Sequence, residues 1–102
     1  MSNLDIFVAE TAKGFEVTVP NSVARGTFHS MHDGDQMSFD KYKVNQILAG
    51  LGLKKDPFFK KCPVTDAPIE RGDYSTYCAY SNELVVRFFD LKNAQTFAAL
   101  LH

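Results

Sequence analysis

Asn82-Glu-Leu-Val-Val-Arg-Phe-Phe-Asp-Leu-Lys-Asn-Ala-Gln-Thr-Phe-Ala-Ala-Leu-Leu101 is the stretch that decides the fold. In its first half Leu84, Val86 and Phe88 alternate with other residues, and this period of two predicts a half-buried strand. Asp90 follows at the position of an N-cap, where its carboxylate would accept hydrogen bonds from the first helical amides. An apolar helical stripe comes next and consists of Leu91, Ala94, Phe97, Ala98 and Leu101. The stretch therefore predicts a strand that leads directly into a C-terminal helix.

Two alternating runs near the N-terminus predict a β-hairpin. Leu4, Ile6 and Val8 share one face of the first run, and the second run covers residues 15–20. Gly14 lies between them and supplies the positive φ that tight hairpin turns need. The proline at the end of the second run either ends that strand or marks it as an edge strand.

The middle of the chain predicts a short second hairpin. Asp33-Gly34 is a strong turn dipeptide, and the residues on its two sides, 27–32 and 35–39, are long enough to pair.

A helix is predicted over residues 40–51. Asp40 would cap it, and an apolar stripe includes Val44 and Leu48. Gly52 suits the left-handed residue that closes a helix, with Leu53 packing back onto Leu48 in a Schellman motif.

A last hairpin joins residues 74–80 to the strand at 83–89. A two-residue turn at Ser81-Asn82 would place Tyr77 opposite Val86 and give one apolar face. The other face would carry Arg87 but also Val85, so we expect it to be partly covered.

Together these elements predict a single α+β domain over residues 1–102. Its small antiparallel sheet would consist of two or three hairpins with two helices packed on one face, in the order ββ(β)αββα. We expect one shared core, made of Phe15, Val17, Val19, Val44, Ile47, Leu48, Leu84, Val86, Phe88, Ala94, Phe97 and Leu101.

Composition excludes several classes of protein. The 102 residues carry a formal net charge of −1. This charge argues against a protein whose whole surface binds nucleic acid, and also against an acidic protein that mimics DNA. The sequence lacks a signal peptide and any apolar run long enough for a membrane span, so a cytoplasmic protein is expected. In a reducing compartment Cys62 and Cys78 would remain thiols.

The most distinctive local feature is a basic and aromatic segment in the long connection between residues 53 and 73. Residues 52–63 hold four lysines and one aspartate, a net charge of +3. The predicted binding residues are Lys54, Lys55, Phe58, Phe59, Lys60 and Lys61. A phenylalanine anchor with steering lysines is typical of docking to an acidic protein surface. Lysines interleaved with aromatic rings also suit a nucleic-acid strand. A third interpretation is that the phenylalanines cover the helix and the lysines are merely solvated.

No metal site or catalytic site is predicted. His29, His32, Cys62 and Cys78 match the ligand count of a structural zinc, but the Cys-x-x-Cys spacing of a zinc knuckle is missing. Asp33-Gly34-Asp35 resembles a fragment of a calcium loop but lacks the later ligands. Nucleophile elbows and glycine-rich phosphate loops are also missing. Because these motifs are missing, a small enzyme with a site at residues 29–35 is kept only as an alternative function.

The function predicted from the sequence is a non-catalytic protein-binding module without a cofactor. Such a chain would occupy a partner's surface, as a small accessory protein or a phage-type inhibitor does. The first alternative is a nucleic-acid-binding accessory protein that uses Lys54–Lys61. The sequence leaves the partner's identity and the oligomeric state open.

Overall fold

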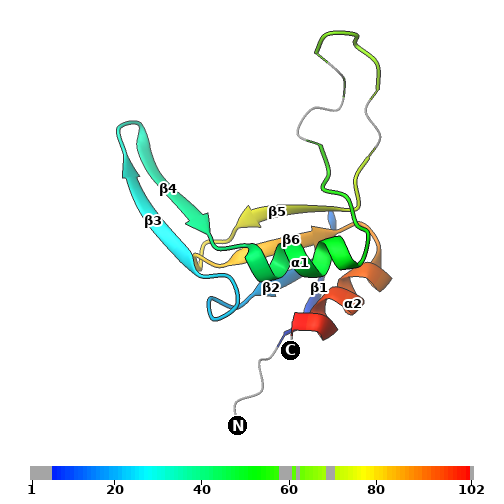
Figure 1. Ribbon diagram of the computed structural model, residues 1–102, viewed down its shortest axis with the longest axis horizontal. Helices are drawn as coiled ribbons and strands as arrows, with labels where there is room; N and C mark the ends of the chain where they lie inside the picture. Colours follow the sequence, from blue (N-terminus) through cyan, green and yellow to red (C-terminus); the bar gives the residue numbers. More distant parts are fainter. Residues whose placement is uncertain (1–5, 58–60, 62, 69–70, 102) are drawn as a thin grey trace.

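The computed structural model describes residues 6–57, 61, 63–68 and 71–101. Within these residues a four-stranded antiparallel sheet has the strand order β1-β2-β6-β5, and β3 and β4 form a separate hairpin (Figure 1). In chain order the elements are β1 (Val8–Thr11), β2 (Gly14–Val19), β3 (Gly26–Met31), β4 (Gly34–Phe39), α1 (Tyr42–Gly50), β5 (Tyr74–Cys78), β6 (Leu84–Phe88) and α2 (Leu91–Leu101). The predicted α+β class and all three predicted hairpins are confirmed.

One buried cluster holds the sheet and both helices together. Val17 lies opposite Val86 where β2 pairs with β6, and both side chains have no exposed surface. The ring of Phe88 in β6 lies 5.2 Å from the ring of Phe97 in α2, at an angle of 50°. Val44 of α1 belongs to the same cluster, so both helices cover the same face of the sheet.

The predicted core is confirmed in full. Ten of its members are buried, and Phe15 and Ile47 are half-buried against them. The cluster also contains Ala24, from the connection between β2 and β3, and Ala98 of α2.

The ends of α1 follow from the residues that flank it. The backbone amide of Tyr42 donates a hydrogen bond of 3.2 Å to Oδ1 of Asp40, yet the helix begins one residue later than a cap at Asp40 predicts. At the other end Gly52 has a φ of +70°, and its amide donates to the carbonyl of Ala49. The amide of Leu53 donates to the carbonyl of Leu48, which completes the predicted Schellman motif.

Asp90 caps α2 as its position predicts. Its Oδ1 accepts a hydrogen bond of 2.8 Å from the backbone amide of Lys92, and its carbonyl accepts one from the amide of Ala94. The strand β6 therefore passes into the helix with only two residues between them.

The predicted register of the last hairpin is wrong by one residue. Tyr77 lies opposite Val85 instead of Val86, because the connection is a three-residue loop over residues 80–82. Asn82 takes the left-handed conformation, with a φ of +60°, and the amide of Ala79 donates to the carbonyl of Glu83. A shift of one residue turns every side chain of a strand to the other face, so Tyr77 lies on the face opposite the helices.

That outer face is partly covered, as its composition predicts. Val85 is only 2% exposed although neither helix covers its face. Thr18 pairs with it from β2 and Tyr77 from β5, and their side chains share its face.

The β3–β4 hairpin projects from the sheet to one side (Figure 1). Phe28 lies opposite Met37 in this hairpin, and the side chain of Phe28 is 60% exposed. The amide of Asp40 donates a hydrogen bond of 2.9 Å to the carbonyl of Arg25, which joins the two ends of the hairpin at its base.

Within the part of the chain that the structure describes, no helix combines the length and apolarity needed to cross a bilayer.

Candidate functional site

The connection between α1 and β5 is anchored at its base by backbone pairing. Lys55 pairs in parallel with Tyr74 at the start of β5. The amide of Asp56 donates to the carbonyl of Tyr74 at 2.6 Å, and the amide of Asp73 donates to the carbonyl of Lys54 at 2.7 Å. The segment at residues 54–56 is therefore held against the edge of the sheet.

Two carboxylates strengthen this base from opposite sides. Oδ2 of Asp73 accepts a hydrogen bond of 2.9 Å from the amide of Lys54, and Oδ1 of Asp56 accepts one of 2.9 Å from the amide of Gly72. A Cβ atom at Gly72 would overlap the backbone of Lys55 and Asp56. The close approach of the two chain segments thus requires glycine at position 72. We call residues 54–56 and 72–74 the basal clamp.

Beyond the basal clamp the connection leaves the domain as a projection. The green and yellow-green trace in Figure 1 extends away from the sheet at the start of β5. Lys61 forms an antiparallel bridge with Pro68, so the two limbs approach each other again. Val64, near the far end, is 89% exposed. The described residues form an extended double-limbed arm that starts from a fixed base.

The structure places three of the six predicted binding residues. Lys54 and Lys55 lie in the basal clamp and Lys61 lies farther along the arm, and all three are exposed. The other three, Phe58, Phe59 and Lys60, lie outside the described residues, so their role stays a prediction.

Lys41 joins this basic group, although no local sequence pattern predicts it. Lys41 immediately precedes α1, whereas the predicted basic segment begins at Lys54. Burial lowers the pKa of the Lys41 ammonium, and the positive charge of Lys55 lowers it further. The effect of the Lys55 charge shows that the two ammonium groups lie close enough to repel each other.

A cation–π contact lies on the return limb of the same connection. The guanidinium carbon of Arg71 lies 3.6 Å from the centre of the Phe89 ring. This contact places a further positive charge next to the basal clamp and packs the limb against the residue that follows β6.

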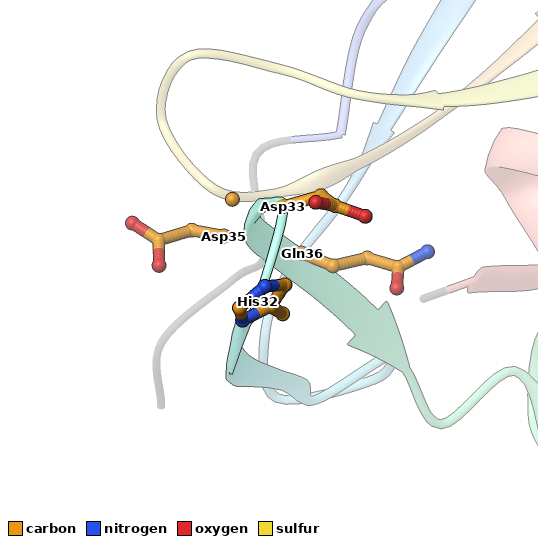
Figure 2. Close-up of a pocket in the computed structure, with 5 residues that line it drawn as sticks. His32, Asp33, Asp35 and Gln36 are labelled. Carbon is orange, nitrogen blue, oxygen red and sulfur yellow. The ribbon is translucent and has the colours of Figure 1, made fainter.

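The tip of the β3–β4 hairpin is the alternative site. Figure 2 shows the residues that line an open depression of about 370 Å³ there, His32, Asp33, Gly34, Asp35 and Gln36. The carboxylates of Asp33 and Asp35 point to opposite sides of the hairpin. They do not converge on one point, so they do not form the paired ligands of a calcium loop.

A histidine and a serine lie within hydrogen-bond reach on the same hairpin. Nε2 of His29 lies 2.8 Å from Oγ of Ser38 on the neighbouring strand. This distance suits a base and a nucleophile, but both side chains are exposed. Among the described residues no carboxylate is bonded to His29 as an orienting group.

The four residues weighed as zinc ligands are only partly described. Cys62 lies outside the described residues, and Cys78 is an exposed free thiol at the end of β5. In the described ranges no group of three or more histidine, cysteine, aspartate or glutamate side chains gathers closely enough to hold a metal ion.

A polar network on the outer face of the sheet was not predicted. The hydroxyl of Tyr77 donates to Oε1 of Glu16, and Arg87 forms a salt bridge of 2.9 Å with Oε2 of Glu16. The signal existed in the strand patterns, since Glu16 and Arg87 fall directly opposite each other once β2 is placed beside β6.

Comparisons of this chain with protein-family models, with curated proteins and with solved structures found no match.

Proposed function

We propose that this chain is a non-catalytic module that binds a partner protein through the arm between α1 and β5. The observation that supports the proposal is the basal clamp, since it fixes the direction in which the arm leaves the domain. A fixed base reduces the conformational entropy that an interacting segment loses on binding. In this proposal the protein acts by occupying its partner's surface, as a small accessory protein or an inhibitor does.

The charge of the arm favours an acidic partner surface. Lys54, Lys55 and Lys61 are exposed, and Lys41 and Arg71 lie beside the base of the arm. Exposed charges of one sign speed the approach of an oppositely charged partner more than they strengthen the final complex. In the proposal Phe58 and Phe59 supply the apolar anchor that strengthens it.

The test compares the arm with lysines elsewhere on the domain. One variant carries Lys54→Gln, Lys55→Gln and Lys61→Gln. A control changes the same amount of charge at three other exposed lysines and carries Lys13→Gln, Lys43→Gln and Lys92→Gln. Partners are captured from the lysate of the native host, identified by mass spectrometry, and then measured in purified form.

We expect the arm variant to slow association with the purified partner at least tenfold, while the control variant changes the rate less than threefold. Phe58→Ala or Phe59→Ala should raise the dissociation rate without lowering the melting temperature. Equal losses in the arm variant and in the control variant would remove the arm from the proposal.

The same experiment distinguishes the nucleic-acid alternative. If the arm binds a nucleic acid, nuclease treatment of the lysate abolishes capture. Binding to a single-stranded oligonucleotide then weakens steeply with salt, and the arm variant reduces that slope because fewer counterions are released.

A further inference from the structure

The strand β5 forms an open edge of the four-stranded sheet. In an antiparallel strand, the backbone N–H and C=O groups of one residue point toward the neighbouring strand on one side. Those of the next residue point toward the opposite side. Ala79 donates to Glu83, and Asp73 accepts from Phe89, so odd-numbered residues of this segment face β6. Thr76 and Cys78 therefore direct their amides and carbonyls away from the sheet. Among the described residues no backbone group bonds to them there.

This open edge is limited at both ends. At one end the backbone of Tyr74 is already bonded to Lys54 and Asp56 in the basal clamp. At the other end the chain turns away at residues 80–82 to enter β6. A slot at residues 75–79 remains, and Figure 1 shows no other strand drawn along it.

The residues of this slot lack the features that usually protect an edge. Sheets avoid unwanted pairing by placing lysine, proline, bulges or other charges on their edge strands. Residues 74–82 contain no charged residue and no proline, whereas charged residues make up 23% of the chain. The other edge strand, β1, carries the charged residue Glu10.

We propose that β5 pairs in antiparallel fashion with β5 of a second copy of this chain, which would join two sheets into one. An uncharged slot pairs with its own copy without like-charge repulsion, and its open length is the same in both copies. The twofold axis passes beside Tyr77. Thr76 then exchanges two backbone hydrogen bonds with Cys78 of the second copy, and Cys78 does the same with Thr76 of the second copy.

This register brings the two Tyr77 side chains together on the outer face. Tyr77 is 38% exposed, and its hydroxyl bond to Glu16 holds its ring on that face in each copy. Residues at a non-hydrogen-bonded position directly opposite each other have closely spaced side chains, and aromatic pairs there stabilise a sheet. Tyr80, whose side chain is fully exposed, follows the slot at each end of the new interface.

The first test is the mass of the unmodified chain as a function of concentration. We expect sedimentation equilibrium to show a shift from the chain mass of 11.4 kDa toward twice that mass as concentration rises. A single mass of one chain across the whole range, up to millimolar protein, would overturn the proposal.

A charge at the axis provides a variant with a matched control. Tyr77→Lys places two like charges directly opposite each other in the dimer, so we expect at least a tenfold weaker association. Thr18→Lys puts the same charge on the same outer face but on β2, two strands from the slot, and should leave association unchanged. Both variants are first checked by circular dichroism to be folded at the assay temperature, because Tyr77→Lys also loses the hydroxyl bond to Glu16. If the two variants associate equally well, the slot is not the interface.

The register is tested by cross-linking in a chain that carries Cys62→Ser and Cys78→Ser. Tyr77→Cys in this background should form a disulfide-linked dimer under mild oxidation, because residue 77 faces its own copy. Ser75→Cys should not, since the two copies of residue 75 lie roughly 13 Å apart along the strands. Equal cross-linking at both positions would overturn this register. A monomer that instead binds an extended peptide from another protein along β5 would overturn pairing with a second copy.

Discussion

The hydroxyl of Tyr77 lies 2.7 Å from Oε1 of Glu16, and this hydrogen bond joins β5 to β2 across the strand between them. Nε of Arg87, on that intervening strand, donates to Oε2 of Glu16 at 3.0 Å. The Arg87 guanidinium also lies 5.0 Å from the centre of the Tyr77 ring. Three strands are thus linked on the outer face by one carboxylate, and the edge strand is fixed by a side chain as well as by its backbone.

This network predicts an alkaline sensitivity. Burial raises the pKa of the Tyr77 phenol, and the hydrogen bond to Glu16 raises it further. Because this pKa is higher in the folded state, the stability that Tyr77 contributes is present at neutral pH and is lost as pH rises through it. Tyr77→Phe should lower the free energy of unfolding by about 1 kcal/mol at neutral pH. Its melting temperature should then fall less steeply than the parent's at alkaline pH.

Thermal unfolding of the parent and of Tyr77→Phe across the alkaline range measures this difference. Burial also raises the pKa of Tyr74, so the variant should retain part of the alkaline sensitivity. If the melting temperatures of the two proteins fall in parallel with pH, the bond to Glu16 contributes nothing to the alkaline sensitivity.

The shared core predicts large losses from truncation. Phe97→Ala and Val86→Ala should each lower the free energy of unfolding by about 2–5 kcal/mol, because each removes a fully buried side chain and leaves a cavity. Leu100→Ala is the control on the same helix. Its side chain is 49% exposed, so its loss should stay below about 1 kcal/mol in chemical denaturation. A loss below about 0.5 kcal/mol for Phe97→Ala would contradict the burial of Phe97 against Phe88.

The sequence predicted the fold well where the deciding interactions are local. Asp90, Gly52 and the alternation through Val86 act within a few residues, and the structure has each of them where the sequence places it. The register at Tyr77 was missed because it depends on the length of a turn. Asn82 can take a left-handed conformation almost as glycine does, and this allows a loop of three residues instead of two.

The candidate site was less predictable, because its contacts are distant in sequence. The lysines at 54, 55 and 61 form a visible run, but Lys41 joins Lys55 only after α1 has folded. The basal clamp likewise depends on Asp73, far along the chain from its partner Lys54. Alternation and capping patterns relate residues only a few positions apart, so they do not predict contacts between residues this far apart in the sequence.

The three-residue loop can be tested at Asn82. Asn82→Gly should leave stability nearly unchanged, because glycine adopts a positive φ without steric cost. Asn82→Ala should lower the free energy of unfolding by about 1 kcal/mol, since alanine is strained in the left-handed region. The comparison is made by chemical denaturation of both variants. Equal stability of the alanine and glycine variants would contradict the left-handed conformation of residue 82.

The basal clamp can be tested at Gly72. Gly72→Ala should lower the free energy of unfolding by about 1–3 kcal/mol, because a methyl group there overlaps the backbone of Asp56. Gly50→Ala is the matched control, since nothing lies within 4 Å of a methyl group at position 50. In the last turn of α1 this control should be neutral or stabilising by up to about 1 kcal/mol. Equal melting temperatures for the two variants would mean that the backbone at the base of the arm shifts to accommodate the methyl group without loss of stability.

The bond between Arg25 and Asp40 also shows how this protein could change during evolution. The two residues meet at the base of the β3–β4 hairpin, so the chain enters and leaves that hairpin at one place. Insertions, deletions or exchanges between residues 26 and 39 would alter the reach of the hairpin and leave the distance between its ends unchanged. Such a segment can diverge rapidly among descendants of this chain while the sheet and its two helices stay the same.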